Sequence, residues 1–414
     1  MKKPIYDALL NYIDADFARF CMPGHKGQNV FCPSGQGFAD IKYDLTETAR
    51  TGDLYEESGF FADSMKAAAA VYGVPALLYS AGGSTLGIQA LCAAYFKTGD
   101  KVLLLRDSHR ALVNALVLLG LNPIWAVDPG DALSKLRRAD GVFLTSPDYF
   151  GSCLNYKKLA AACHKKHIPL LVDSAHGAHF PALGLPTAIA SGADASVVGL
   201  HKTLPALTGA AAVLLSDAGM TGKVRAGMRL FGSTSPSYLI ALSAENAVAS
   251  LEADRDRWQA LATLCNTFRA QFPALFLPND DPTRLVLCCE NAAEALDRGE
   301  ISAEYADENC AVLLCSPYNR EIDFARLNAV CRTLRPKKTE IPPSELPKIK
   351  LPPREAFFSS SRPVSVEDAI GKISAESVCI CPPCRTILCC GELITVKTVK
   401  FLKTYGKTTV DVLK

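Results

Sequence analysis

The chain has 414 residues, 49% of them hydrophobic, and its acidic and basic residues nearly balance to a formal net charge of +2. Because a single core rarely grows beyond about 250–300 residues, this length predicts a large domain and a smaller one. The mixed charges exclude the strong fields typical of proteins that bind nucleic acid or membrane surfaces, and no apolar run reaches the ~18–20 residues of a membrane-spanning helix. We expect a cytoplasmic protein whose partner is a small molecule or a second copy of itself.

The 16 cysteines do not predict a disulfide framework. Most of them stand singly in apolar segments such as LCAAYF, KLAAACHKK and LNAVCRTL. Free cysteine in such a setting behaves as a small hydrophobic residue, and reduced thiols are therefore expected.

The first 60 residues predict an arm rather than a domain. A helical pattern runs from Tyr6 to Phe20, a rigid loop CMPGHKG follows at 21–27, and the polar stretch DLTETARTGDLYEESG occupies 44–59. A loop of this length ahead of the first regular unit often carries function.

Residues 61–245 alternate short apolar runs with helical patterns. ALLYS leads into GGSTLGIQALCAAYF, KVLLLRD into SHRALVNALVLLG, and PLLVDSA into GAHFPALG. This rhythm predicts an α/β domain with a mostly parallel sheet between helices. Ligands of such sheets gather at the carboxyl ends of the strands, so the polar residues that close each apolar run are the candidate site.

The remaining residues predict a connection and a second domain. A long helical pattern from Tyr238 to Phe272 predicts a connecting helix at 246–275. Beyond it, short apolar runs such as TRLVLCC and CAVLLCS alternate with helical patterns, which predicts a small α/β domain at 276–414. The Pro-rich segment IPPSELPKIKLPPREA is expected to be a linker or an extended arm.

Three strand-end motifs are weak signals when each is taken alone. The turn GGST places Gly83, Ser84 and Thr85 at the start of a helix, where backbone amides and hydroxyls can hold a phosphate. After KVLLLRDS, His109 could stack on a planar ring, although a lone histidine there is more often a loop residue or a helix cap. TSPDY at 145–149 is more often an ordinary turn.

A carboxylate at the end of an apolar strand is a stronger signal. Asp173 closes the run PLLVD, and a buried charge of this kind is costly unless it is paired. A protonated pyridine nitrogen would supply the cation, with His176 within reach of a hydroxyl on the same ring. The competing interpretation is a metal site that His179 and His201 would complete. We assign no metal.

Lys202 supplies the reactive group of this set. It follows the run ADASVVGLH and precedes LPALTG, and this context would hold its amine rigidly at the edge of a sheet. An ordinary surface lysine is the alternative. A phosphate turn, a stacking ring, a carboxylate for a pyridinium and an amine for a Schiff base, in that order, are what a pyridoxal phosphate (PLP) enzyme needs. The combination predicts PLP as the cofactor.

These motifs resemble those of the ornithine/lysine/arginine decarboxylases, a family of fold type I PLP enzymes, in the shorter form without an N-terminal flavodoxin-like domain. The resemblance rests on MPGHKG, DLTETARTGDLYEESG, GGST, DSHRA, SPDYFG, VDSAHGAHF, HKTLPALTG and STSPSY, in this order. It implies a large PLP-binding domain at 61–245 with a mostly parallel seven-stranded sheet, and a smaller C-terminal α/β domain.

The resemblance also implies roles for single residues. Lys202 would form the Schiff base, Asp173 would pair with the pyridine nitrogen, His109 would stack on the ring, and His176 would lie near the phenolic oxygen. His201 or Lys202 would carry the proton of the reaction.

Phosphate binding and assembly are implied in the same way. Gly83, Ser84 and Thr85 would hold the phosphate, and Ser233 and Thr234 would reach the phosphate of a neighbouring subunit. The site would therefore lie at the interface of a homodimer or of a dimer of dimers.

The implied activity is decarboxylation of a basic amino acid to its amine and carbon dioxide, within polyamine biosynthesis. Arginine is the expected substrate, with lysine and ornithine as alternatives. The cofactor residues do not decide which bond breaks, so an aminotransferase or a lyase on the same scaffold stays open. A degenerate member with a structural or regulatory role is the third interpretation.

Two departures from the family pattern bear on specificity. Gly199 and Leu200 stand where the family commonly has hydroxyl residues, which removes one phosphate contact. A family signature resembling AExVxxYPPGIPxxxPGE reads AESVCICPPCRTILCCGE here, with Cys381, Cys384 and Arg385 among the replacements. A single C-x-x-C pair favours loop drift over a metal site. The carboxylates that could bind a substrate's distal cation are Glu47, Asp53, Glu56, Glu57 and Glu392.

Overall fold

A computed structural model describes residues 18–20, 53–56, 60–337, 346–380 and 385–414 of the chain. Its centre is a seven-stranded sheet with the strand order β2-β8-β7-β6-β5-β3-β4. The strands are β2 (Ala76–Ser80), β3 (Lys101–Leu105), β4 (Asn122–Ala126), β5 (Gly141–Thr145), β6 (Leu170–Asp173), β7 (Ala195–Val198) and β8 (Ala211–Leu215).

The sheet is mostly parallel, as the sequence predicts. The strands from β4 to β7 pair in parallel, whereas β8 runs antiparallel to both β7 and β2. The strands β6, β7 and β8 are buried along their whole length, which is why they read as continuous apolar runs. The parallel strands bring their carboxyl ends to a single edge of the sheet.

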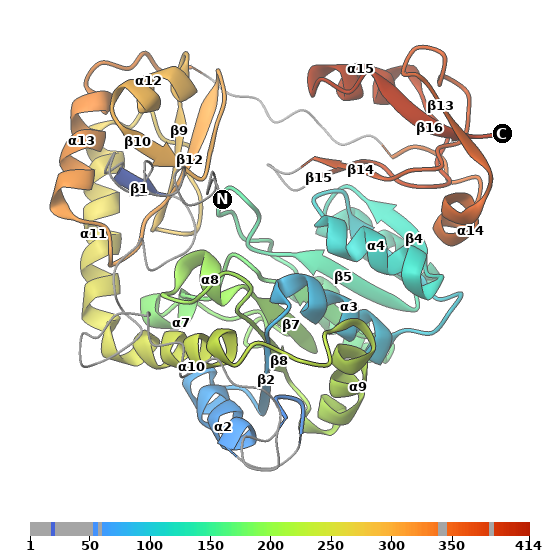
Figure 1. The fold of residues 1–414 in the computed structure, drawn as a ribbon, viewed down its shortest axis with the longest axis horizontal. Helices are drawn as coiled ribbons and strands as arrows, with labels where there is room; N and C mark the ends of the chain where they lie inside the picture. The colour runs from blue at the N-terminus through green and yellow to red at the C-terminus, as the bar shows by residue number, and fades with distance from the viewer. Residues whose placement is uncertain (1–17, 21–52, 57–59, 338–345, 381–384) are drawn as a thin grey trace, which may run out of the picture.

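Helices cover both faces of the sheet (Figure 1). Successive strand residues point to opposite faces, so Leu103, Leu144 and Val172 pack on one face, and Leu104 and Phe143 pack on the other. The helices of this domain are α2 (Phe60–Tyr72), α3 (Gly83–Tyr95), α4 (Arg110–Leu119), α5 (Pro129–Lys135), α6 (Lys157–Lys165), α7 (Phe180–Leu183), α8 (Leu200–Thr203) and α9 (Thr221–Phe231).

The long helical pattern at 238–272 forms two helices, not one. α10 (Tyr238–Ala253) ends at Asp254, and α11 (Arg255–Gln271) begins directly after it. The Tyr318 hydroxyl donates to a carboxylate oxygen of Asp254 at 2.6 Å, so a tertiary contact holds the side chain at the break. Figure 1 shows α11 rising from the sheet domain to the next group of strands.

The N-terminal pattern predicted as a helix is wrong at its end. Residues Ala18–Phe20 form strand β1, which pairs in parallel with β10 (Ile301–Ala303). Phe20 is fully buried and its ring meets that of Phe324 edge to face, with centroids 5.6 Å apart. Pairing and burial therefore override the local helical pattern. Residues 1–17 lie outside the described part of the chain.

The segment 276–414 contains two groups of strands that share no sheet. The first group, the β9 lobe, comprises β9 (Arg284–Cys288), α12 (Ala292–Arg298), β10, β11 (Tyr305–Ala306), β12 (Cys310–Leu314) and α13 (Glu321–Cys331). The second group, the C-terminal lobe, comprises α14 (Pro353–Phe358), β13 (Ser361–Ser365), β14 (Val378–Ile380), β15 (Arg385–Leu388), α15 (Val396–Thr404) and β16 (Thr409–Leu413). In Figure 1 the two lobes stand at opposite sides of the sheet domain. The predicted domain boundaries at 60, 245 and 275 stay predictions.

Two further features concern the described residues only. None of their helices has the length and apolar character needed to cross a bilayer. Their cysteines form no disulfide, and apart from Cys153 they are buried.

Candidate active site

A pocket at the carboxyl edge of the sheet collects four of the predicted residues. His109, Asp173, His176 and Lys202 all line it. They follow strands β3, β6 and β7, whose ends meet at this edge (Figure 1). The structure therefore brings together four residues that lie between positions 109 and 202 of the sequence.

Asp173 is the buried carboxylate of the pocket. Its side chain is 3% exposed, and its Oδ1 atom accepts a hydrogen bond from the Ala175 amide at 3.0 Å. Thr145 pairs with it in register across β5 and β6, and the Thr145 hydroxyl is buried without a hydrogen-bond partner in the described structure. Within the described residues no cationic side chain forms an ion pair with Asp173. The pocket therefore holds a carboxylate that can receive a cation.

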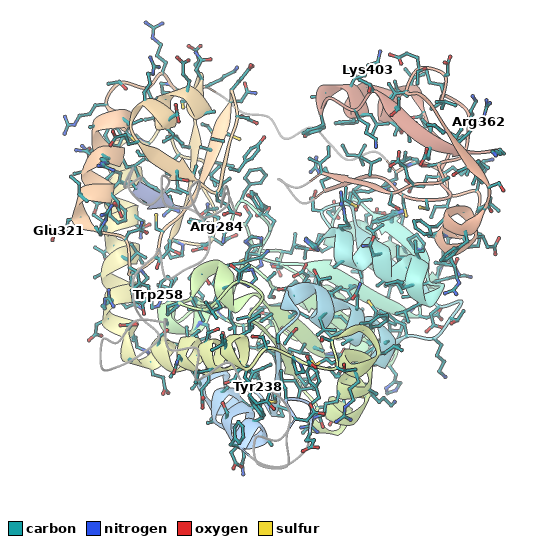
Figure 2. The ribbon with its side chains drawn as sticks, in the orientation of Figure 1. Tyr238, Trp258, Arg284, Glu321, Arg362 and Lys403 are labelled. Carbon is teal, nitrogen blue, oxygen red and sulfur yellow. The ribbon has the colours of Figure 1, made fainter. Side chains whose placement is uncertain are left out.

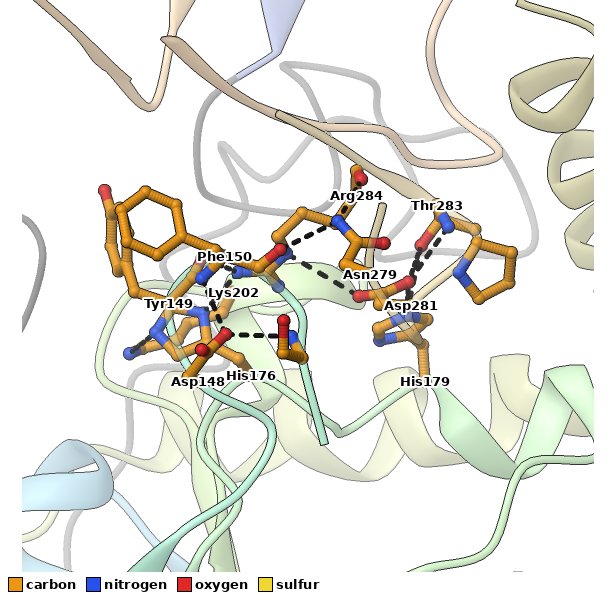
Figure 3. Close-up of polar contacts among 12 residues, drawn as sticks. Asp148, Tyr149, Phe150, His176, His179, Lys202, Asn279, Asp281, Thr283 and Arg284 are labelled. Atoms are coloured by element: carbon orange, nitrogen blue, oxygen red, sulfur yellow. Dashed lines mark hydrogen bonds and ion pairs between the residues drawn. The ribbon is translucent and has the colours of Figure 1, made fainter. Parts of the chain in front are cut away.

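Lys202 and His176 are in direct contact. The Lys202 Nζ atom lies 2.9 Å from His176 Nε2, and the contact is drawn in Figure 3. The short helix α8 holds Lys202 in place, with its amide donating to the Gly199 carbonyl at 3.1 Å. Burial lowers the pKa of His176 well below its ordinary value, and the nearby charge of Arg284 lowers it further. His176 is therefore a neutral imidazole at physiological pH.

His109 caps a helix as well as lining the pocket. Its Nδ1 atom accepts a hydrogen bond from the Ala111 amide at 3.0 Å at the start of α4. Burial lowers the pKa of His109, and this effect is partly offset by the charge of Asp173 and reinforced by that of Arg110. Because Nδ1 accepts, the neutral ring carries its proton on Nε2. The cap fixes the orientation of the ring at the pocket wall.

The GGST turn lies at the start of α3, and its role in phosphate binding stays a prediction. Gly83 has φ +68°, a left-handed conformation that glycine adopts without strain, and its amide donates to the Gly209 carbonyl at 2.7 Å. The Ser84 Oγ atom is buried and has no hydrogen-bond partner in the described structure. Thr85 is exposed. Gly83 thus shapes the turn, and Ser84 offers an unsatisfied donor.

Gly199 lies against this turn. A Cβ atom at this position would come within 2.8 Å of the Ala175 carbonyl oxygen, 3.1 Å of Ser84 Oγ and 3.2 Å of Lys202 Cδ. The departure noticed in the sequence therefore has a structural reason, because the backbone packs too closely here for a side chain.

Six predicted site residues do not line this pocket, namely Gly83, Ser84 and Thr85 of the turn described above and His201, Ser233 and Thr234. The His201 ring is turned to the Ala210 carbonyl oxygen, which Nδ1 contacts at 2.9 Å. Ser233 and Thr234 are exposed, and Ser233 Oγ accepts from the Ser235 amide at 3.1 Å. Their predicted contact with a neighbouring subunit stays a prediction.

The alternative metal set does not come together. His179 Nε2 lies 3.1 Å from Asp281 Oδ1, and its ring stacks on Trp258 with centroids 5.0 Å apart. His179 therefore contacts other partners and does not line the pocket that holds Asp173 and His176. Among the described residues, no group of three or more His, Cys, Asp or Glu side chains has the geometry of a metal site. Cys381 and Cys384 lie outside the described residues.

Sequence reasoning missed two arginines, one from each lobe. Arg284 opens β9 and its Nη1 atom donates to His176 Nδ1 at 3.0 Å. Arg385 opens β15, lines the pocket, and donates through Nε to Asp107 at 2.7 Å. A single sequence carries little sign of either role. The one available signal is that Arg284 begins an otherwise apolar strand, where a buried guanidinium needs partners.

The structure shows where the described candidate carboxylates for the distal cation of a substrate lie. Glu392 is fully buried in an ion pair with Arg106 and does not line the pocket. Asp53 lies 3.7 Å from Arg229, and Glu56 is exposed. Glu47 and Glu57, and the loop at 22–27, lie outside the described residues. The carboxylates that do line the pocket are Asp107 and Asp148, in addition to Asp173.

The sequence profile described as Orn/Lys/Arg decarboxylase, major domain, matches residues 3–134 and 130–285. The chain belongs to the Orn/Lys/Arg decarboxylase family. It is 30% identical over 455 aligned residues to the uncharacterized protein YaaO of Bacillus subtilis, covering 97% of this chain and 94% of that protein. It is 25% identical to an arginine decarboxylase of Bacillus subtilis, covering 96% of this chain and 92% of that enzyme.

A solved structure supports the fold of this Orn/Lys/Arg decarboxylase family member. The constitutive lysine decarboxylase of Escherichia coli superposes with a TM-score of 0.75 at 16% identity, covering 100% of this chain and 82% of that one. The predicted fold type I architecture with a mostly parallel seven-stranded sheet is confirmed.

Proposed function

We propose that this chain is a PLP-dependent decarboxylase of a basic amino acid, with arginine as the expected substrate and lysine and ornithine as alternatives. The observation that carries the proposal is the convergence of the Lys202 amine, the His176 imidazole and the buried Asp173 carboxylate on one pocket. Family membership and the arginine decarboxylase relatives support the same activity.

The side chains present fit PLP. Asp173 is buried without a described cationic partner and would pair with the pyridinium nitrogen, and Ser84 Oγ is a buried hydroxyl free to donate to the phosphate. Lys202 would hold the cofactor covalently, and His109 would lie against its ring. Bound PLP would act as an electron sink for the α-carbon of the substrate, which weakens the bond to the carboxylate.

The chain's own residues would orient the cofactor and protonate the α-carbon of the substrate. Asp173 would hold a proton at the ring nitrogen of bound PLP, because its burial makes a neighbouring cation strongly favourable. His176 contacts the Lys202 amine, and because its ring is neutral it places no positive charge beside that amine. We assign the proton delivered to the α-carbon to Lys202 Nζ, since it lines the pocket while His201 Nδ1 is engaged by Ala210.

Charge at the pocket supports a cationic substrate. Asp107 and Asp148 both line the pocket. The Asp148 Oδ1 atom accepts from the Phe150 and Ser152 amides at 2.9 and 2.8 Å, which holds the carboxylate in place, and burial raises the pKa of Asp148. Arg385 neutralises Asp107 in part, so the choice among the three substrates depends on a local balance of charges.

The test is a comparison of products. Purified protein with PLP is assayed for carbon dioxide release from arginine, lysine and ornithine and for keto-acid formation from each. We expect carbon dioxide from at least one substrate, loss of that activity in Lys202→Ala, and no change in Lys66→Ala, which replaces an exposed lysine on α2. Keto acid without carbon dioxide would indicate an aminotransferase. Absence of both products, with no visible absorbance from lysine-bound cofactor, would favour the degenerate interpretation.

We also propose a cytoplasmic homodimer, or dimer of dimers, with shared sites, whose amine product enters polyamine biosynthesis. Ser233 and Thr234 are exposed and do not line the pocket of their own chain, which supports a contact across the dimer. Mixing inactive Lys202→Ala subunits with inactive Ser233→Ala/Thr234→Ala subunits should restore activity at one site per hybrid dimer. Mixtures that stay inactive while hybrids form would exclude shared sites.

A further inference from the structure

Arg284 belongs to the β9 lobe but reaches into the edge of the central sheet. Its side chain is 1% exposed, and Figure 2 places it between that lobe and the sheet domain. The backbone at this point is anchored, because the Arg284 carbonyl oxygen accepts from Arg269 Nη2 at 2.8 Å and from Asn279 Nδ2 at 2.9 Å. The guanidinium therefore starts from a fixed position.

The guanidinium contacts the ring that touches Lys202 (Figure 3). Arg284 Nη1 donates to the Tyr149 carbonyl oxygen at 2.9 Å and lies 3.0 Å from His176 Nδ1, while Nε lies 3.6 Å from Asp281 Oδ2. A guanidinium has donors and no acceptor. The His176 Nδ1 atom must therefore accept this hydrogen bond and carry no proton.

The position of the remaining proton on His176 follows. The ring is neutral, because Nδ1 accepts from Arg284 and burial lowers the pKa of His176 well below its ordinary value. A neutral imidazole carries one proton, which must then be on Nε2. That atom lies 2.9 Å from Lys202 Nζ, so Nε2 donates and the lysine nitrogen accepts.

An accepting lysine nitrogen is an unprotonated amine. An ammonium group has no lone pair and could only donate, which would require His176 to accept at both ring nitrogens. A ring with two acceptors is an imidazolate, a state that a neutral histidine does not reach at physiological pH. The contact with Arg284 and the contact with Lys202 are compatible only when Lys202 is a free amine.

We propose that Arg284 is a positioning residue that fixes the Nε2-protonated tautomer of His176 and thereby holds Lys202 as the unprotonated amine. This is the form of lysine that can attack a carbonyl carbon. The use of that amine toward PLP rests on the proposed function, but the tautomer and the state of the amine do not, and they are measured without cofactor.

The tautomer is read directly by nitrogen NMR of the cofactor-free protein labelled with ¹⁵N-histidine. The chain has 7 histidines, and the His176 signals are assigned by their loss in His176→Gln. We expect wild-type His176 to be neutral with its proton on Nε2. A proton on Nδ1, or protons on both nitrogens, would overturn the proposal, and this result needs no Arg284 variant to fold.

Two variants test the role of Arg284 itself. Arg284→Lys keeps a cationic donor and is expected to keep the tautomer, whereas Arg284→Met removes the donor and should move the proton to Nδ1, with Lys202 donating as an ammonium. A folded Arg284→Met protein with the wild-type pattern would overturn the assignment. Circular dichroism shows whether each variant is folded.

The state of the amine is read by trace acetylation at pH 7 with mass spectrometry. Labelling of Lys202, normalised to the exposed Lys66, should fall about tenfold or more in Arg284→Met, the effect of losing one hydrogen bond to a charged group. Arg284→Lys should retain most of the labelling. Equal labelling in wild type and Arg284→Met contradicts the proposal. Absence of decarboxylation in a wild-type protein that shows the expected tautomer and labelling would contradict the proposed function alone.

Discussion

Arg106 and Glu392 are 286 residues apart in sequence and form a buried ion pair, with Arg106 Nη2 donating to Glu392 Oε1 at 2.5 Å. The two side chains are 1% and 0% exposed, and the guanidinium also lies over the Trp125 ring at 4.2 Å. Arg106 directly precedes the loop that carries Asp107 and His109 to the pocket. The pair therefore joins the C-terminal lobe to the segment that positions a site residue.

The first prediction concerns the stability of this pair. Glu392→Ala removes the carboxylate that faces a buried guanidinium and should lower the free energy of unfolding by about 3–5 kcal/mol in denaturant titrations. The double variant Arg106→Met/Glu392→Leu should recover most of that loss, because neither charge is left behind. Glu294→Ala is the control, since its pair with Arg298 is 65% and 70% exposed and should change stability by less than about 1 kcal/mol. Equal effects of the two single variants would contradict the structural role of the buried pair.

The second prediction separates binding from folding at Ser84. Because Ser84 Oγ has no partner in the described structure, Ser84→Ala removes no hydrogen bond among the described residues. It should therefore leave the free energy of unfolding of the cofactor-free protein unchanged or slightly higher. The same change should weaken PLP binding about tenfold or more, since a hydrogen bond to a charged phosphate is worth about 1.5–3 kcal/mol. Equilibrium dialysis gives the affinity. Unchanged affinity would remove Ser84 from the phosphate site.

The third prediction tests the close packing at Gly199. Gly199→Ser restores a hydroxyl residue of the kind common in the family, yet its Cβ would meet the Ala175 carbonyl oxygen at 2.8 Å and crowd Ser84 and Lys202. We expect a loss of about 1–3 kcal/mol in stability and weaker PLP binding. Gly222→Ala is the matched control, because a Cβ there has nothing within 4 Å and alanine favours the helix α9. A Gly199→Ser protein that binds PLP more tightly than wild type would show that the backbone gives way.

The fourth prediction concerns the pH dependence of stability. Burial alone would raise the pKa of Asp281, but His179 and Arg284 outweigh burial, and the pKa lies well below its ordinary value. A carboxyl whose pKa is lowered by folding stabilises the folded state above the unfolded pKa of about 3.9, and that contribution is lost as the pH falls below it.

The measurement is denaturant unfolding between pH 7 and pH 2. Below about pH 4, this one group should lower the free energy of unfolding by up to ~1.4 kcal/mol for each pH unit. Asp281→Asn should be less stable at neutral pH and should show a shallower acid slope. The exposed Asp297→Asn on α12 serves as the control and should keep the wild-type slope. An unchanged acid slope in Asp281→Asn would exclude this source of pH dependence.

The fold was predictable where local pattern and burial agree. Strands such as β6 and β8 are buried on both faces, so their sequences are continuous apolar runs that stand out between helical patterns. Prediction was wrong for β1, because the strand exists only through its pairing with β10, 281 residues or more away along the chain. It was also incomplete at Asp254, where a contact with Tyr318 marks the break between two helices.

The sequence by itself determined the chemistry available to the site. Lys202, Asp173, His176, His109 and the GGST turn each close or follow an apolar strand, and parallel strands place such ends at one edge for a simple geometric reason. The succession of apolar runs along the chain and the periodicity within them are local properties, so they can be read from one sequence.

Tertiary structure alone decided how those groups are tuned. Arg284 and Arg385 come from two separate lobes. Glu392, a candidate for binding the distal cation of the substrate, is instead paired with Arg106. A buried charge is stable only beside its partner, and partners that lie a hundred or more residues apart leave no periodic pattern in the sequence. The position of Lys202 after an apolar strand can therefore be read from the sequence, whereas its neighbourhood with Arg284 appears only when the lobes are folded against the sheet.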